Sequence, residues 1–194
     1  MYTKKLYDTP VFQFTIPIDN EKLAEGIYRL KEEDSKGVPL SNQGGWHSKP
    51  MYSDPQFNTP IDEVFTPITN VFPNILPTLP FQPPINRIGS IGIWANINQR
   101  GDYNISHNHP TCDMSGVYYV KVPKGDSGAL VFEDPRPAYV FGNRFYVDRY
   151  TQGNMHGVTP EEGTMFLFPS SLMHSVLANK TDEDRISISF NIVL

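Results

Sequence analysis

The segment GTMFLFPSSLMHSVLANKTDEDRISISFN, residues 163–191, gives the clearest indication of the fold class of this 194-residue chain. Its first run, 163–169, and a second run, 185–193, which continues two residues past its end, are rich in β-branched and aromatic residues and are bounded by turn formers, which is typical of β-strands. A lone histidine, His174, follows the first run, and Arg185 opens the second run eleven residues later. This segment therefore predicts two strands, with the isolated polar side chains His174 and Arg185 near them.

The same alternation of strand and turn extends upstream as far as residue 85. Strands are predicted at 88–98, 114–122 and 127–134, and two weaker candidates lie at 138–147 and 173–178. About seven or eight strands are the number of a jelly roll, in which two sheets pack face to face. We expect an all-β core with a few flanking helices.

The first 84 residues contain the helical candidates. Residues 20–33 repeat apolar side chains at helical spacing, and Asp19 or Asn20 can cap the start. A second helix is predicted over 61–72, although Pro67 interrupts its pattern.

Two other N-terminal segments are expected to lack regular structure. The polar, glycine-rich segment SNQGGWHSKPMYS, 41–53, predicts a structured loop that borders a site, and the proline-rich segment 73–84 is expected to cross the surface. We expect a single domain, in which 1–84 pack on a barrel formed by 85–194.

Composition narrows the classes of partner and compartment. A net charge of −5 with no Lys/Arg cluster argues against binding to a nucleic-acid backbone. The single cysteine, Cys112, excludes an intramolecular disulfide and fits a reducing compartment. Because no apolar run has the length of a signal peptide or a membrane span, we expect a soluble, cytoplasmic protein without a membrane partner. A homodimer is left open.

The motif HNHP, 107–110, is the first chemical signal. His107 and His109 are two residues apart, and alternate side chains of an extended chain share a face, so both rings can reach one ion. Imidazole binds iron, zinc, copper and nickel, so the pair is compatible with a metal but does not select one. The alternative is a pair of solvated surface histidines.

Several short motifs, in this order, carry a resemblance to a known family: GGWHS (44–48), HNHP (107–110), SGVYYV (115–120), DPR (134–136) and FPSSLMHSV (168–176). Together they resemble a family of 2-oxoglutarate oxygenases that is known mainly from bacteria and phages and is related to prolyl hydroxylases. The fold that the resemblance implies is the double-stranded β-helix, the cupin-like form of the jelly roll.

The resemblance also implies a ligand set and a reaction. Fe(II) would be held by three histidines, His107, His109 and His174. The co-substrates would be 2-oxoglutarate and O2, and hydroxylation of an unidentified small-molecule or peptidyl substrate would release succinate and CO2.

The co-substrate's distal carboxylate requires a buried cation, and Arg185 is our candidate. A guanidinium matches a carboxylate with two parallel hydrogen bonds, and Ser187 shares its strand face. Similarity to prolyl hydroxylases adds the Tyr119 hydroxyl. The alternatives are a surface ion pair between Arg185 and the acidic residues 182–184, and an ordinary core role for Tyr119.

The second ligand position departs from the usual pattern, in which it is a carboxylate. Here it is His109, so the site has no compensating negative charge. Asp113 is the nearby carboxylate that could replace it. Two other functions therefore stay open: a cupin-type three-histidine metalloenzyme that does not use 2-oxoglutarate, and a non-catalytic ligand-binding module.

Other polar and aromatic residues are placed less specifically. His47 and His156 lie in polar segments with nearby glycines and are expected to be solvated. Trp46 and Trp94 could line a substrate mouth or pack in the core. Two asparagines alternate with apolar residues and could point toward the metal, Asn96 and Asn98.

Overall fold

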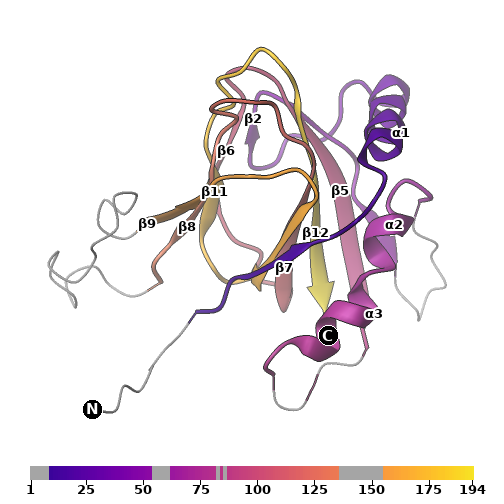
Figure 1. Cartoon of the computed structure of the whole chain (residues 1–194), viewed down its shortest axis with the longest axis vertical. Coiled ribbons are helices and arrows are strands. Elements are labelled where there is room, and N and C mark those ends of the chain that lie inside the picture. The colour runs from indigo at the N-terminus through magenta and orange to yellow at the C-terminus, as the bar shows by residue number, and fades with distance from the viewer. Residues whose placement is uncertain (1–8, 54–61, 82–83, 85–86, 136–154) are drawn as a thin grey trace, which may run out of the picture.

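Two antiparallel sheets pack against each other in the computed structural model (Figure 1). The structure describes residues 9–53, 62–81, 84, 87–135 and 155–194. The predicted strand at 138–147 lies outside these residues. The expectation of a mostly β chain is confirmed.

The larger sheet has seven strands. Along it run β1 (Phe12–Thr15), β10 (Thr164–Pro169), β7 (Met114–Lys121), β12 (Arg185–Val193), β5 (Ser90–Asn98) and β3 (Trp46–His47), with β4 (Met51–Ser53) also paired to β5. Long β12 lies between β5 and β7 and is hydrogen-bonded on both sides.

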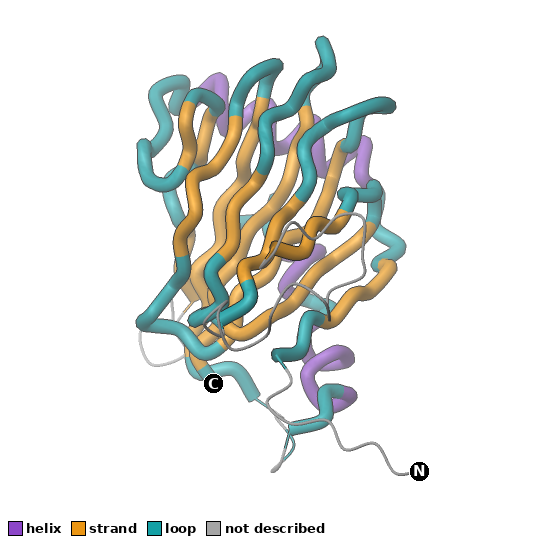
Figure 2. Tube along the Cα trace, turned by 90° about the vertical axis from the view of Figure 1, so that its left-hand side faces the viewer, coloured by secondary structure: helices purple, strands orange, loops and turns teal. Residues whose placement is uncertain are grey.

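The smaller sheet has five strands, all of them short. Its order is β2 (Asn42–Gln43), β6 (Tyr103–His107), β11 (His174–Val176), β8 (Leu130–Glu133) and β9 (Met155–Val158). A small apolar cluster fills part of the space between the two sheets and includes Leu130 and Phe132 of β8 with Phe166 and Phe168 of β10. Figure 2 shows the strands side by side, with helices behind them.

The other face of the larger sheet carries the main apolar core, which the helices cover (Figure 1). Helix α1 (Asn20–Glu33) begins as predicted, because the Asp19 side chain accepts a hydrogen bond from the Lys22 amide at 3.1 Å. Alternation along β12 explains the two faces. Ile186, Ile188 and Ile192 enter the core, whereas Ser187 and Ser189 face the other way, into a cavity.

The prediction of one helix over 61–72 is wrong. The chain forms two short helices, α2 (Thr66–Thr69) and α3 (Phe72–Ile75), followed by the 3-10 helix η1 (Leu76–Thr78). A proline lies in the first turn of each, where its missing N–H costs nothing. Segment 73–84 was also wrongly expected to cross the surface, since Ile75, Leu76 and Leu79 are buried.

Segment 41–53 is also more regular than expected. It forms three short strands, β2, β3 and β4, which pair with β6 and β5. Gly44 and Gly45 have φ values of 68° and 67°, and this turn carries the chain from the smaller sheet to the larger one.

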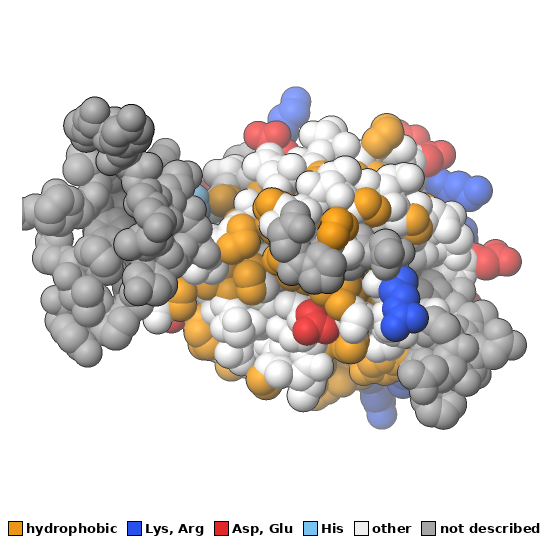
Figure 3. Space-filling model, turned by 90° about the horizontal axis from the view of Figure 1, so that it is seen from below, with side chains coloured by type: hydrophobic (Ala, Val, Ile, Leu, Met, Phe, Trp, Pro, Cys, Tyr) orange, Lys and Arg blue, Asp and Glu red, His pale blue; other side chains and the backbone are white. Residues whose placement is uncertain are grey.

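On the face in Figure 3, acidic and basic side chains of the described residues are scattered among apolar and neutral ones. In the described part of the chain, no helix is long and apolar enough to cross a membrane.

Candidate functional site

A cavity of about 620 Å³ lies between the two sheets. Its described lining includes His107 and His174 from the smaller sheet and Tyr119, Arg185 and Ser187 from the larger one. Residues far apart in the sequence therefore face one cavity.

Three histidines converge in this cavity. His107 ends β6, His174 begins β11, and the two are directly paired across these strands, while His109 follows two residues after β6. One nitrogen from each ring lies within 4.8 Å of the others, and the ring centroids are 4.4 to 5.4 Å apart. Such spacing suits a single metal ion.

Hydrogen bonds fix the tautomer of two of these rings. The Nδ1–H of His107 donates to the Ile105 carbonyl at 2.8 Å, and the Nδ1–H of His174 donates to the Leu172 carbonyl at 2.8 Å. Because a carbonyl only accepts, Nδ1 carries the proton and the Nε2 lone pair is free for a metal.

Burial keeps the three rings uncharged at neutral pH. Loss of hydration, with a smaller contribution from neighbouring imidazoles, lowers the pKa of His109 and of His174 to about 4. Burial also lowers the pKa of His107. Neutral imidazole is the form that binds metals, so no proton has to be removed first.

The structure does not bring Asp113 to the histidines. Its carboxylate accepts a hydrogen bond from the Leu194 amide at 2.8 Å. Within the described residues, the metal-ligating group that contains these histidines includes no carboxylate.

Arg185 is the charged side chain that lies deepest in the described structure, with 1% of its surface exposed. Its Nη1 donates to the carbonyls of Ser127 at 2.6 Å and Gly128 at 3.0 Å, and lies 3.5 Å from that of Leu177. Its Nε has no acceptor among the described residues, and none of their carboxylates forms an ion pair with it. Burial lowers the pKa of Arg185 from its ordinary, very high value.

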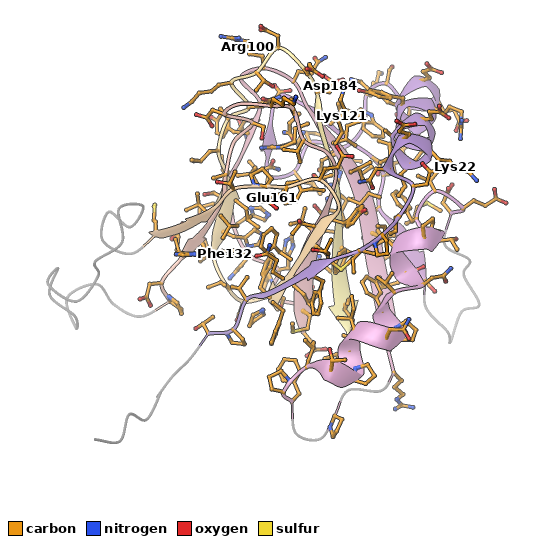
Figure 4. All side chains as sticks on the ribbon, viewed as in Figure 1. Lys22, Arg100, Lys121, Phe132, Glu161 and Asp184 are labelled. Carbon is orange, nitrogen blue, oxygen red and sulfur yellow. The ribbon has the colours of Figure 1, made fainter. Side chains whose placement is uncertain are left out.

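The alternative of a surface ion pair for Arg185 is therefore wrong. Its three acidic neighbours in sequence have other partners: Asp182 with Arg100, Glu183 with Lys121 and Asp184 with Tyr28. Arg100 and Lys121 are labelled in Figure 4, where the Arg100 side chain points away from the barrel. A buried guanidinium without a carboxylate partner is suited to an anionic ligand.

Tyr119 and Ser187 lie opposite each other on β7 and β12 and both line the cavity. Tyr119 is 1% exposed, and burial raises its pKa to about 12, an effect that the nearby Arg185 opposes. The phenol therefore stays protonated as a donor at neutral pH.

His47 was wrongly expected to be solvated. It is 3% exposed, lines the cavity and stacks on Trp94, with ring centroids 5.4 Å apart and an angle of 14°. The Gly44-Gly45 turn is the sequence signal that could have predicted the burial of His47. After this turn the chain pairs with β5, and His47 lies opposite Asn96. His156 is exposed, as predicted.

Of the remaining candidates, Asn96 and Asn98 line the cavity as predicted, and Asn96 donates to the Ser189 hydroxyl at 3.0 Å. Trp94 also lines the cavity. Trp46 is instead buried, and its indole N–H donates to the Asp34 carbonyl at 2.7 Å.

The donor set fits a divalent metal together with a dianionic chelator. Three neutral nitrogen ligands on one side of an ion leave its other positions open. The buried Nε of Arg185, which lacks an acceptor, supplies a cation for a carboxylate in the same cavity. The comparisons with known proteins agree with this reading.

A family model described as "Putative 2OG-Fe(II) oxygenase" matches residues 92–191, which is more than half of the chain. This segment contains the three histidines, Tyr119, Arg185 and Ser187. No curated protein matches the chain.

Solved structures share the fold at low identity. A Pseudomonas putida prolyl-4-hydroxylase is 16% identical, with 95% of this chain and 92% of that chain covered and a TM-score of 0.60. A Trichoplax adhaerens prolyl hydroxylase in complex with a hypoxia inducible factor peptide fragment is 11% identical, with 94% and 83% covered and a TM-score of 0.61. The epimerase SnoN in complex with Fe3+, alpha ketoglutarate and nogalamycin RO is 12% identical, with 95% and 79% covered and a TM-score of 0.55. The fold is thus the double-stranded β-helix.

Proposed function

Because the chain belongs to the 2OG-Fe(II) oxygenase family, we propose that it hydroxylates a small-molecule or peptidyl substrate with release of succinate and CO2. One observation carries the proposal: three neutral imidazoles and a guanidinium without a carboxylate partner face the same cavity. Iron(II) and 2-oxoglutarate, when bound, supply the oxidising chemistry with O2.

The proposed roles of the residues follow from their positions. His107, His109 and His174 hold the metal through ring nitrogens that are already deprotonated. Their main-chain partners, the carbonyls of Ile105 and Leu172, hold two of the rings in orientation.

At the other end of the cavity, Arg185 binds the distal carboxylate of 2-oxoglutarate. Tyr119 and Ser187 lie beside it and donate further hydrogen bonds to the same group. Since this end is buried, water competes poorly for the carboxylate and each hydrogen bond is stronger than at the surface.

The substrate is proposed to occupy the remaining part of the cavity. A volume of about 620 Å³ is within the usual range for binding pockets and leaves room beside a five-carbon keto acid. Peptide and small-molecule substrates both remain candidates, since the Trichoplax enzyme is bound to a peptide fragment and SnoN to nogalamycin RO.

We further propose a single domain for the whole chain. The described part of the first 84 residues packs on the larger sheet through α1, α2 and α3, and it contributes β1, β3 and β4 to that sheet and β2 to the smaller one. The packing and the shared sheets support a single unit.

A cupin-type enzyme that does not use 2-oxoglutarate is the second candidate, and the all-histidine ligand set favours it. The two candidates differ at Arg185. Activity that needs no added keto acid and survives Arg185→Ala would support the cupin-type enzyme. The oxygenase is inactive without 2-oxoglutarate, and its Arg185→Ala variant should require a much higher 2-oxoglutarate concentration.

The test begins with purified protein, iron(II) and ascorbate. Succinate and CO2 are expected to form from 2-oxoglutarate, and calorimetry of manganese-loaded protein is expected to show binding of 2-oxoglutarate and of its mimic N-oxalylglycine. If neither keto-acid binding nor decarboxylation is detected with a range of candidate substrates, the proposed function is wrong.

A further inference from the structure

The main chain around Arg185 determines where its guanidinium lies. We call the carbonyls of Ser127, Gly128 and Leu177 the carbonyl collar. They surround Nη1 at 2.6, 3.0 and 3.5 Å, which is one acceptor more than its two N–H bonds can fully serve. Carbonyl dipoles fix the group but carry no formal charge, so the full positive charge stays available to a ligand.

The collar joins two separate segments of the chain. Ser127 and Gly128 precede β8, and Leu177 follows β11. The Leu177 amide also donates to the Ala129 carbonyl at 2.9 Å, so the two segments are tied together next to the collar. This hydrogen bond opposes separation of the two segments.

Gly128 lies where these segments approach each other closely. Its φ is +88°, and a Cβ at this position would lie 2.1 Å from the Leu177 carbonyl oxygen and 2.7 Å from Nη1 of Arg185. Both distances are far below van der Waals contact, and one of the two atoms belongs to the backbone. Any side chain must therefore part the segments or displace the guanidinium.

We propose that Gly128 is a positioning residue for 2-oxoglutarate: the absence of a side chain allows the carbonyl collar to close on Arg185 and aims the guanidinium at the distal carboxylate. This inference rests on the proposed function, in which Arg185 binds that carboxylate. It predicts that Gly128 controls selectivity for keto acids with a distal carboxylate and does not control metal binding.

The same loop offers a matched control, Gly125. Its φ is +106°, so an alanine there has comparable backbone strain, but the nearest atom that a Cβ would meet is Thr181 Cγ2 at 3.6 Å, an ordinary contact. Gly125→Ala therefore reproduces the strain without touching Arg185.

The experiment measures the ratio of two dissociation constants in manganese-loaded protein. The ligands are 2-oxoglutarate and 2-oxobutyrate, which keeps the chelating end but has no distal carboxylate. The original protein and Gly125→Ala are expected to prefer 2-oxoglutarate strongly. In Gly128→Ala this preference is expected to fall by about 10- to 100-fold, because a displaced guanidinium meets the carboxylate poorly, while the affinity for manganese alone is unchanged.

Arg185→Met separates this inference from the proposed function. If Arg185→Met keeps the preference for 2-oxoglutarate, the proposed role of Arg185 is wrong. If Arg185→Met loses the preference and Gly128→Ala keeps it, the role of Arg185 stands and the inference about Gly128 is overturned.

A second pair of variants covers failure to fold. Asparagine tolerates a positive φ better than alanine does, so Gly128→Asn reduces the strain and retains the clash, with Gly125→Asn as its control. If both Gly128 variants fail to fold while both Gly125 variants fold, the glycine serves the fold as a whole, and its proposed role in selectivity is overturned.

Discussion

The two ends of the cavity are built in different ways. At the histidine end, His107 and His174 sit at the ends of short strands and are oriented by carbonyls only two residues away in sequence. At the arginine end, Arg185 lies on a nine-residue strand, and the carbonyls of Ser127 and Gly128 that hold it are 58 and 57 residues away. The orientation of these two histidine rings is therefore set by neighbours in the sequence, whereas the position of the guanidinium depends on the packing of distant segments.

Removal of a metal ligand should greatly weaken metal binding at the histidine end without changing the arginine end, and it should have the largest effect on function. His174→Ala is expected to weaken manganese or iron(II) binding by more than about 100-fold and to abolish 2-oxoglutarate turnover, because loss of a direct metal ligand costs more than loss of a group that only orients a ligand. Calorimetry and a succinate assay measure the two effects.

His156→Ala is the control for this variant, since His156 is an exposed histidine on β9. It should bind metal as the original protein does. Equal loss in both variants would mean that the three histidines are not the metal site.

Loss of the guanidinium should break the arginine end alone. Arg185→Met is expected to weaken 2-oxoglutarate binding by at least about 30-fold, or about 2 kcal/mol, the lower range for loss of a buried charge partner. Its affinity for manganese alone should stay within about twofold, because no histidine contact is lost.

Arg100→Met is the matched control, because Arg100 is exposed and pairs with exposed Asp182. It should leave 2-oxoglutarate binding unchanged. A large fall in manganese affinity in Arg185→Met would contradict the separation of the two ends.

A change of pH should affect the histidine end of the metal-free protein. The pKa values of His109 and His174 are about 4 in the folded state and near 6.5 in the unfolded state. Between these values the unfolded chain binds more protons, so stability should fall as the pH is lowered from about 6.5 toward 4.

Thermal unfolding at a series of pH values measures this effect, with His174→Gln as the comparison. The variant has one fewer depressed histidine, so its melting temperature should fall less steeply over the same range. An equal or steeper fall would show that His174 does not carry the linkage.

The smallest expected effect concerns a single hydroxyl at the arginine end. Tyr119→Phe keeps the ring in the cluster between the sheets and removes one proposed donor to the co-substrate. A loss of about 1 kcal/mol, roughly fivefold in 2-oxoglutarate affinity, is expected. Tyr103→Phe, at an exposed tyrosine on β6, should cause no change, and a null result in Tyr119→Phe would return Tyr119 to a purely structural role.

The difference between the two ends also explains what the sequence could predict. The long strands β5, β7, β10 and β12 and helix α1 are marked by apolar periodicity, and all were predicted within two residues at each end. The histidine cluster could be proposed from HNHP and the family resemblance. Local pattern was enough for the strands and the helix, whereas the assignment of His174 to the cluster needed the resemblance.

Elements that depend on distant partners could not be predicted. Strand β6 reads YNISH and β2 reads NQ, and such polar segments become strands only because neighbours in the smaller sheet pair with them. The burial of His47 and the carbonyl collar around Arg185 likewise arise from contacts between segments, and neither leaves a periodic signal in the sequence.

Trp94 gives the cavity an intrinsic optical reporter. Its indole stacks on His47 and lies 6.0 Å from the His109 ring, so a metal or ligand that arrives there changes the surroundings of the fluorophore. The chain has one other tryptophan, Trp46, which is buried and hydrogen-bonded to the Asp34 carbonyl and should contribute a constant background. Emission from unlabelled protein should therefore follow occupancy of the cavity during a titration.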